Sequence, residues 1–158
     1  LYEFGKLLTT VNESWNNIDI YNATQSIKTF GTGILASHYL EMVKKRLYDG
    51  NNAAAWTIHR IFRDLMTVFS PVCPLFTHHI SSTIYGVSAV DIRSHPLPLN
   101  IQFNEDSNIT EDIISFNAKV WKAKADEGVS LAAPISGIEI PENLSEFEEI
   151  LTAMHKIE

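Results

Sequence analysis

Helical periodicity constrains this chain most: in its first hundred residues apolar side chains recur every three or four positions, and strand patterns are almost absent. Residues 1–14 already show the pattern, with Phe4, Leu7, Leu8 and Val11 on one face. Four helices are expected, at residues 1–14, 20–48, 53–69 and 74–86. Short connections between helices of this length predict a helical bundle.

Residues with strong positional preferences define the ends of these helices. Asp19 and Asn52 are expected N-caps, Pro74 suits the first turn of the fourth helix, and Gly86 is expected to end it. Gly31 and Gly33 interrupt the long second helix, and each costs about 1 kcal/mol against Ala. We interpret the pair as a bend or a close contact with another helix.

The second half of the chain predicts a different organisation. Residues 88–109 lose periodicity and read as an extended linker. A helix at 111–125, a short strand at 138–140 and a last helix opened by the capping-box pattern Ser145–Glu148 follow. The predicted architecture is therefore mainly α: a bundle at 1–87, the linker at 88–109, and a small α/β appendage at 110–158 that reads as truncated.

Composition excludes some classes of protein. The chain is 45% apolar and 20% charged, an ordinary mix for a soluble globular protein. No apolar run approaches the ~18 residues of a membrane span, and the start lacks the basic and apolar regions of a signal peptide. The single cysteine, Cys73, fits a reducing compartment, so we expect a cytoplasmic protein. Without an initiator Met, the chain reads as part of a longer protein.

Net charge alone argues against a nucleic-acid partner, since it is −7. Its distribution changes that reading. Residues 27–63 carry six basic and two acidic side chains, whereas residues 105–158 carry four basic and twelve acidic ones. The first of these segments could therefore meet phosphate.

One row of the long helix changes from apolar to polar along its length, running from Ile27 to Tyr48. Aromatic rings stack on unpaired bases, lysines meet phosphates, and a carboxylate can accept from a base amine, so this row suits a single-stranded RNA loop. The alternative is a solvated helix end whose basic residues complement the helix dipole. The candidate RNA-binding residues here are His38, Tyr39, Glu41, Lys44, Lys45, Arg46 and Tyr48.

A second row lies on the third helix, where Trp56, Arg60 and Arg63 follow one another at helical spacing. Tryptophan beside arginine can line an RNA groove. The alternative is a partly buried Trp covered by arginine stems.

Cys73, His78 and His79 could suggest zinc, but adjacent histidines diverge on a helix and a closed site needs four ligands. No catalytic triad order, phosphate-binding glycine loop or paired-carboxylate motif is present. We therefore expect no metal, no cofactor and no catalytic residue in these 158 residues.

Three segments resemble one family in the same order. Tyr39-Leu-Glu-Met-Val-Lys44 is similar to the Tyr-(Leu/Ile)-Glu-x-x-Lys of the anticodon-binding domain of class I aminoacyl-tRNA synthetases, of the valyl type found in archaea. Pro71-x-x-Pro74-Leu-Phe-Thr77 resembles their Pro-Phe-x-Pro-Phe-x-Thr, although His78 and His79 stand where the family has two glutamates. The segment 122–131 resembles a third motif that follows their bundle.

The resemblance implies a fragment that recognises the tRNA anticodon stem-loop. The parent would ligate valine to tRNA with ATP and magnesium, as a monomer, through catalytic and editing domains upstream in the same chain. Two alternatives stay open: the same domain of an isoleucyl, leucyl or methionyl enzyme, and a helical protein-interaction bundle with no RNA role.

Overall fold

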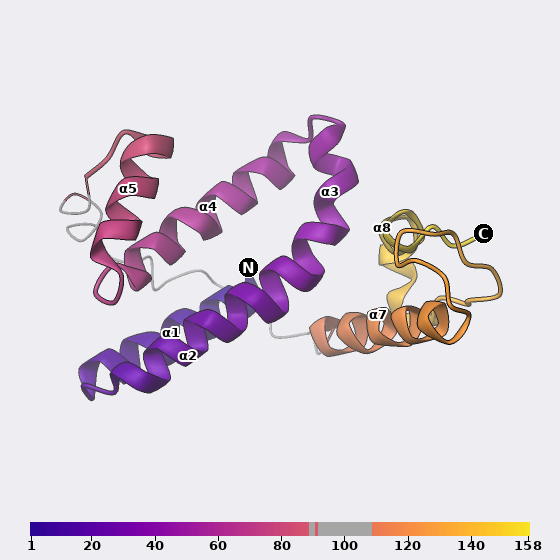
Figure 1. The fold of residues 1–158 in the computed structure, drawn as a ribbon, viewed down its shortest axis with the longest axis horizontal. Coiled ribbons are helices and arrows are strands. Elements are labelled where there is room, and N and C mark those ends of the chain that lie inside the picture. The colour runs from indigo at the N-terminus through magenta and orange to yellow at the C-terminus, as the bar shows by residue number, and fades with distance from the viewer. Residues whose placement is uncertain (89–90, 92–108) are drawn as a thin grey trace. The chain divides into compact units, whose positions relative to one another are not determined.

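The computed structural model describes residues 1–88, 91 and 109–158. The chain divides into two compact units. The first comprises Leu1–Gly33 with Asn52–Glu105, and the second comprises Ile34–Asn51 with Asp106–Glu158. The described residues are mainly helical, as the sequence predicted (Figure 1).

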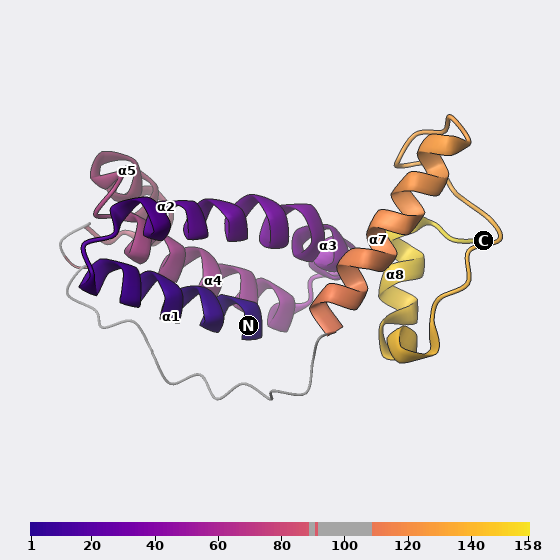
Figure 2. The ribbon, with the colours of Figure 1, turned by 90° about the horizontal axis from the view of Figure 1, so that it is seen from below.

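The first unit is built on three helices, α1 (Tyr2–Asn16), α2 (Ile20–Thr29) and α4 (Asn52–Phe69). Figures 1 and 2 show α1 and α2 side by side, and α4 contacts both. α5 (Pro74–Tyr85) packs on α4. The aromatic rings of Phe4 and Phe30 meet in the core with their centroids 5.6 Å apart. The apolar face predicted for the first helix is buried, which confirms that part of the core.

Local chemistry sets the helix ends in this unit. The side chain of Asp19 accepts a hydrogen bond from the backbone N–H of Asn22 at 3.0 Å, so it caps α2 as predicted. Pro74 occupies the first turn of α5, and Gly86 ends that helix at φ 66°, a left-handed conformation that favours glycine.

The long helix expected from Ile20 to Tyr48 is continuous but changes type. α2 passes into a π-helix, η1 (Phe30–Tyr39), and then into α3 (Leu40–Tyr48). Gly31 and Gly33 both lie in the π-helical segment. A Cβ on either glycine would have no atom within 4 Å, so the expectation of a close helix contact was wrong. Both glycines, which have a low α-helical propensity, lie where the α-helix gives way to the wider π-helical turn.

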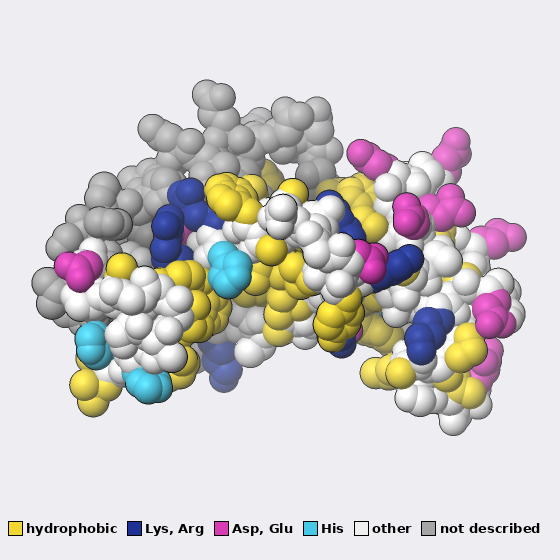
Figure 3. Space-filling view, turned by 90° about the horizontal axis from the view of Figure 1, so that it is seen from above, with side chains coloured by type: hydrophobic (Ala, Val, Ile, Leu, Met, Phe, Trp, Pro, Cys, Tyr) yellow, Lys and Arg dark blue, Asp and Glu magenta, His cyan; other side chains and the backbone are white. Residues whose placement is uncertain are grey.

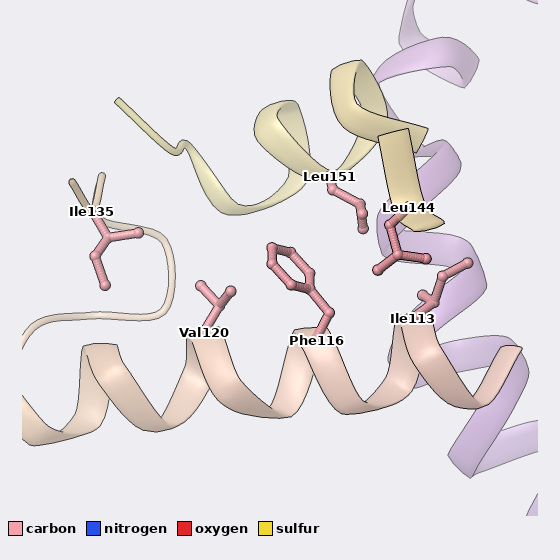
Figure 4. Packing of buried hydrophobic residues seen from close by; sticks show 6 residues of the cluster. All are labelled: Ile113, Phe116, Val120, Ile135, Leu144 and Leu151. Atoms are coloured by element: carbon pink, nitrogen blue, oxygen red, sulfur yellow. The ribbon is translucent and has the colours of Figure 1, made fainter. Parts of the chain in front are cut away.

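The second unit contains α3, α7 (Ile109–Asp126), the 3₁₀ helix η2 (Glu142–Phe147) and α8 (Glu148–His155). α8 packs against α3, and η2 joins both α7 and α8. Figure 4 shows side chains from one face of α7 directed toward η2, α8 and the loop that precedes η2. This core consists of Ile113, Phe116, Val120, Ile135, Leu144 and Leu151.

Two expectations for this unit were wrong. Residues 138–140 form no strand; an isolated parallel bridge joins Ile135 to Ile157 instead, because the C-terminal end of the chain returns beside the loop. Ser145 does not cap the last helix: it lies inside η2, and the N-cap of α8 is Phe147. The 3₁₀ turn begins earlier, after Pro141, and buries Leu144.

The predicted linker falls almost wholly on residues 89–90 and 92–108, outside the described residues. The division into domains at 87 and 110 therefore stays a prediction. Among the helices that the structure describes, none is long and apolar enough to cross a membrane.

Candidate nucleic-acid interface

α3 is amphipathic, and its polar face is open to solvent. Val43 is buried and anchors the helix, while Met42 packs against the core of the second unit. The opposite side exposes Lys45 and Arg46, and at the helix end the Tyr48 side chain is 81% exposed. An exposed aromatic ring next to basic groups is the arrangement expected of a surface that binds single-stranded nucleic acid.

A groove of about 700 Å³ runs along this polar face. Its size falls within the roughly 300–1,000 Å³ typical of small-ligand sites. One wall is α3, and the other combines α7, the loop after it, and the end of α8. The lining residues are Glu41, Met42, Lys44, Lys45, Tyr48 and Asp49 on the α3 side, and Trp121, Leu131, Ala132, Ala153, Met154 and Lys156 opposite.

The groove mixes apolar surface with positive charge. The Lys44 ammonium lies 3.3 Å from the Glu41 carboxylate, so this pair is largely self-neutralised. Lys45 and Lys156 are exposed, and within the described residues neither forms an ion pair. Lys45 and Lys156 can therefore contact anions, and the nearby Glu41 carboxylate can accept a hydrogen bond from the amino group of a base.

A chain of buried and partly buried hydrogen bonds joins η1, α7 and the end of α8. The amide nitrogen of Asn117 lies 3.0 Å from Nδ1 of His38, and its oxygen lies 2.7 Å from Nε2 of His155. The His38 ring also stacks on Trp121, with centroids 5.3 Å apart. Asn117 and His155 are almost fully buried, so they order the helices rather than contact a ligand.

A buried lysine continues this network. The Lys124 ammonium donates to the carbonyl oxygens of Leu131 at 2.8 Å, Ala133 at 2.7 Å and His155 at 2.8 Å. Three acceptors match the three N–H groups of a protonated lysine. The side chain is wholly inaccessible to solvent, and buried lysines are rare unless their charge is satisfied in this way.

Burial shifts the pKa values of this network downward. The pKa of His155 falls to about 4, chiefly through burial and then through the nearby charges of Lys124 and His38. Burial also lowers the pKa of His38. The pKa of Lys124 is lowered by burial first and by the charge of Lys156 second. Both histidines are therefore neutral at pH 7, which suits their hydrogen bonds to Asn117.

The second predicted row lies on α4, in the first unit. Trp56 is exposed, and Asp64 is buried between two arginines. Its carboxylate accepts from Nε of Arg60 at 2.7 Å and lies 3.6 Å from Nε of Arg63. Figure 3 shows basic side chains next to hydrophobic ones on one face of the molecule. Since one carboxylate faces two guanidinium groups, the cluster keeps a net positive charge.

The structure thus brings together four of the predicted residues, Glu41, Lys44, Lys45 and Tyr48, in one groove. His38 is partly buried beneath it, Tyr39 is partly buried, and Arg46 is exposed outside the lining. Trp56, Arg60 and Arg63 belong to the other unit.

Sequence reasoning missed the opposite wall of the groove and the network under it. Trp121, Met154 and Lys156 were not among the residues that the sequence predicted to bind RNA. Lys124 carried a detectable signal, since it follows Val120 by four positions on the buried face of α7. No group of three or more possible metal ligands occurs within the described part of the chain.

The chain is similar to known proteins over most of its length. Residues 1–140 match the model of a family described as the anticodon-binding domain of tRNA ligase. A valine–tRNA ligase from Saccharolobus solfataricus is 31% identical over 138 residues, which cover 86% of this chain and 16% of the relative. The enzyme of the same name from Aeropyrum pernix is 30% identical over 94% of this chain and 19% of its own length. The enzyme of that name from Nanoarchaeum equitans is 29% identical over 90% of this chain and 18% of its own length. The chain therefore spans less than a fifth of the length of these relatives.

Proposed function

Because the chain belongs to the anticodon-binding domain family of tRNA ligases, we propose that it binds the anticodon stem-loop of a tRNA through α3 and the groove beside it. The observation that carries this proposal is the groove itself. It places the exposed side chains of Tyr48, Lys45 and Lys156 along one opening. Single-stranded loops are bound by such combinations of stacking and phosphate contacts.

Each group has a distinct role in this proposal. Tyr48 stacks on an unpaired base, and Lys45 and Lys156 meet backbone phosphates. Glu41 accepts from a base amine and gives sequence preference, while Lys44 holds the Glu41 carboxylate in place at 3.3 Å. Arg46, exposed outside the groove, meets phosphate further along the loop. His38 and Tyr39 support α3 from the partly buried side.

A second set of contacts is proposed on α4. The exposed Trp56 ring offers a stacking surface, and Arg63 offers a guanidinium whose side chain is about half exposed. Arg60 is more buried and is held by Asp64, so it contributes charge at a fixed position.

The parent protein is proposed to be a valine–tRNA ligase, since the relatives described above carry that name. Its activity would use ATP and magnesium in domains outside this sequence, with this fragment itself non-catalytic. We further propose a cytoplasmic monomer, with a bundle at residues 1–87, a linker at 88–109 and an appendage at 110–158.

Two experiments test the proposal. A fluorescence titration with labelled valine tRNA should show saturable binding that weakens as salt increases, because phosphate contacts release counterions. Equal binding to a duplex RNA of the same length would argue against loop recognition. An ATP–pyrophosphate exchange assay with valine should show no turnover by the purified chain, and clear exchange would refute its non-catalytic role.

The alternatives give different results. A domain from an isoleucyl, leucyl or methionyl enzyme would prefer the corresponding tRNA over valine tRNA in competition. A helical protein-interaction bundle would bind none of these RNAs at any salt concentration.

A further inference from the structure

The groove has one wall made of a continuous helix and another made of separate segments. α3 forms the first wall. The second includes Leu131 and Ala132 from the loop after α7, and Met154 and Lys156 from the end of α8. More than twenty residues separate these segments in sequence, so their relative position depends on contacts between them or with a shared residue.

Lys124 binds the backbone of both segments. Two of its carbonyl partners, Leu131 and Ala133, flank Ala132 in the loop. The third, His155, lies between Met154 and Lys156. The loop and the end of α8 are therefore each tied through their own backbone to one buried ammonium group, which α7 carries.

We propose that Lys124 is a positioning residue for RNA binding, which fixes the second wall of the groove without contacting the RNA. This inference rests on the proposed function of the groove. Complete burial excludes a direct contact, because no atom of the side chain reaches the surface. An apolar side chain at this position would leave three carbonyl groups without their donor, which is unfavourable in a buried site.

The second wall has other supports, so loss of Lys124 should loosen it rather than unfold the unit. The backbone N–H of Ile135 donates to Lys156 at 3.1 Å, and that of Glu158 donates to Ile135 at 3.0 Å. The unit also has an apolar core that includes Phe116, Val120 and Leu151 but not Lys124. We therefore expect a local effect on the loop and the end of α8.

The charge of Lys124 adds a second, weaker contribution. The pKa of Lys124 is lowered in part by the charge of Lys156, so the two ammonium groups interact electrostatically. A buried cation behind the wall makes the groove more attractive to phosphate. Its loss should change affinity, while the number of phosphate contacts stays the same.

The test compares Lys124→Met with Lys122→Met, an exposed lysine on the same helix. Binding to a labelled anticodon stem-loop of valine tRNA is titrated at several salt concentrations. Lys124→Met should weaken binding about tenfold, the scale of a lost coupling within one network, and leave the salt slope unchanged. Lys122→Met should bind like the original chain. A reduced salt slope for Lys124→Met would indicate a direct phosphate contact and overturn the positioning role.

A chemical rescue separates positioning from general folding. In a Cys73→Ser background, which removes the only native cysteine, Lys124→Cys is alkylated with 2-bromoethylamine while unfolded and then refolded. The resulting thialysine restores an ammonium group, so affinity should recover. Failure to recover, or unaltered affinity in Lys124→Met, contradicts the proposal.

Hydrogen exchange completes the test. In Lys124→Met, protection should fall at the amides of Ile135 and Glu158 and remain in α1, α2 and α4. Loss of protection throughout the chain would assign Lys124 to overall folding and overturn the local role. If the unmodified chain binds no RNA, the proposed function fails, whereas faster exchange at these amides would still show that Lys124 holds the wall.

Discussion

Asn117 and His155 form a hydrogen bond of 2.7 Å between the amide oxygen and Nε2, in the interior of the second unit. The same amide donates through its nitrogen to Nδ1 of His38, 3.0 Å away. Asn117 thus connects the helical segment that leads into α3 with the end of α8. α8 packs against α3, and the Asn117 link joins the segments on both sides of that packing.

Replacing Asn117 with Leu should destabilise the chain by about 1–3 kcal/mol, because a buried donor on His155 and an acceptor on His38 lose their partner. Urea unfolding followed by circular dichroism measures the change. The exposed Asn143, which bonds Asp112 on the surface, is a matched control whose replacement should stay within about 0.5 kcal/mol. Equal effects at both positions would refute the importance of the buried link.

Stability should depend on pH through His155. Its folded pKa of about 4 lies below the ordinary value of 6.5, so the unfolded chain binds the proton more tightly. The stabilisation is complete above pH 6.5 and is lost as the pH falls from 6.5 to about 4, on the order of 3 kcal/mol in all.

Urea unfolding between pH 4 and pH 8 checks this expectation. Carboxylates also titrate there, so the comparison is with His155→Gln, whose stability should fall less steeply over this range. Parallel profiles for the unmodified chain and His155→Gln would contradict the lowered pKa.

Several elements could be predicted because local residues determine them. The cap at Asp19, the proline start of α5 and the glycine end at Gly86 each depend on a few neighbouring residues. The buried face of α1 follows from the spacing of Phe4, Leu7, Leu8 and Val11. The polar character of α3 was predictable for the same reason, and so were the four groove residues on it.

The rest depends on contacts between distant segments. The second wall is supported by a bridge between Ile135 and Ile157, a non-local contact that the alternation at 138–140 does not indicate. From its charge alone, a lysine such as Lys124 would be expected at the surface. Its burial is explained by three carbonyl acceptors, those of Leu131, Ala133 and His155, which distant parts of the chain supply. The π-helical segment that contains Gly31 and Gly33 likewise could not be predicted from the low helix propensity of glycine alone.

Removing a phosphate contact should change the salt dependence of binding. Lys45→Ala should reduce the slope of log affinity against log salt by about 0.7–1, the value for one contact. Titrations of labelled stem-loop between low and physiological salt measure the slope. Lys119, an exposed lysine on α7 outside the groove lining, provides a control with no expected change. An unchanged slope for Lys45→Ala would place its ammonium away from the RNA.

Glu41 should contribute to base preference rather than to general affinity. Glu41→Ala should cost about 1–3 kcal/mol for the native anticodon and reduce discrimination against altered ones, by analogy with direct base readout. The measurement is aminoacylation kcat/KM of the full-length parent with native and altered anticodons. Lys44→Ala should give a smaller loss of the same kind, because it frees the carboxylate that Lys44 holds. Unchanged kcat/KM and preference in Glu41→Ala would show that this face is merely solvated.

The most direct test of the groove is to find which nucleotides it touches. Tyr48, 81% exposed at its edge, is replaced by the photoreactive benzoylphenylalanine, and the chain is irradiated in complex with valine tRNA. Tyr21 on α2, also exposed and outside the groove lining, carries the same probe as a control. Reverse transcription then maps the cross-linked positions. Cross-links from position 48 confined to the anticodon loop, and absent there from position 21, are the predicted result; cross-links from position 48 to the acceptor stem, or none at all, would contradict it.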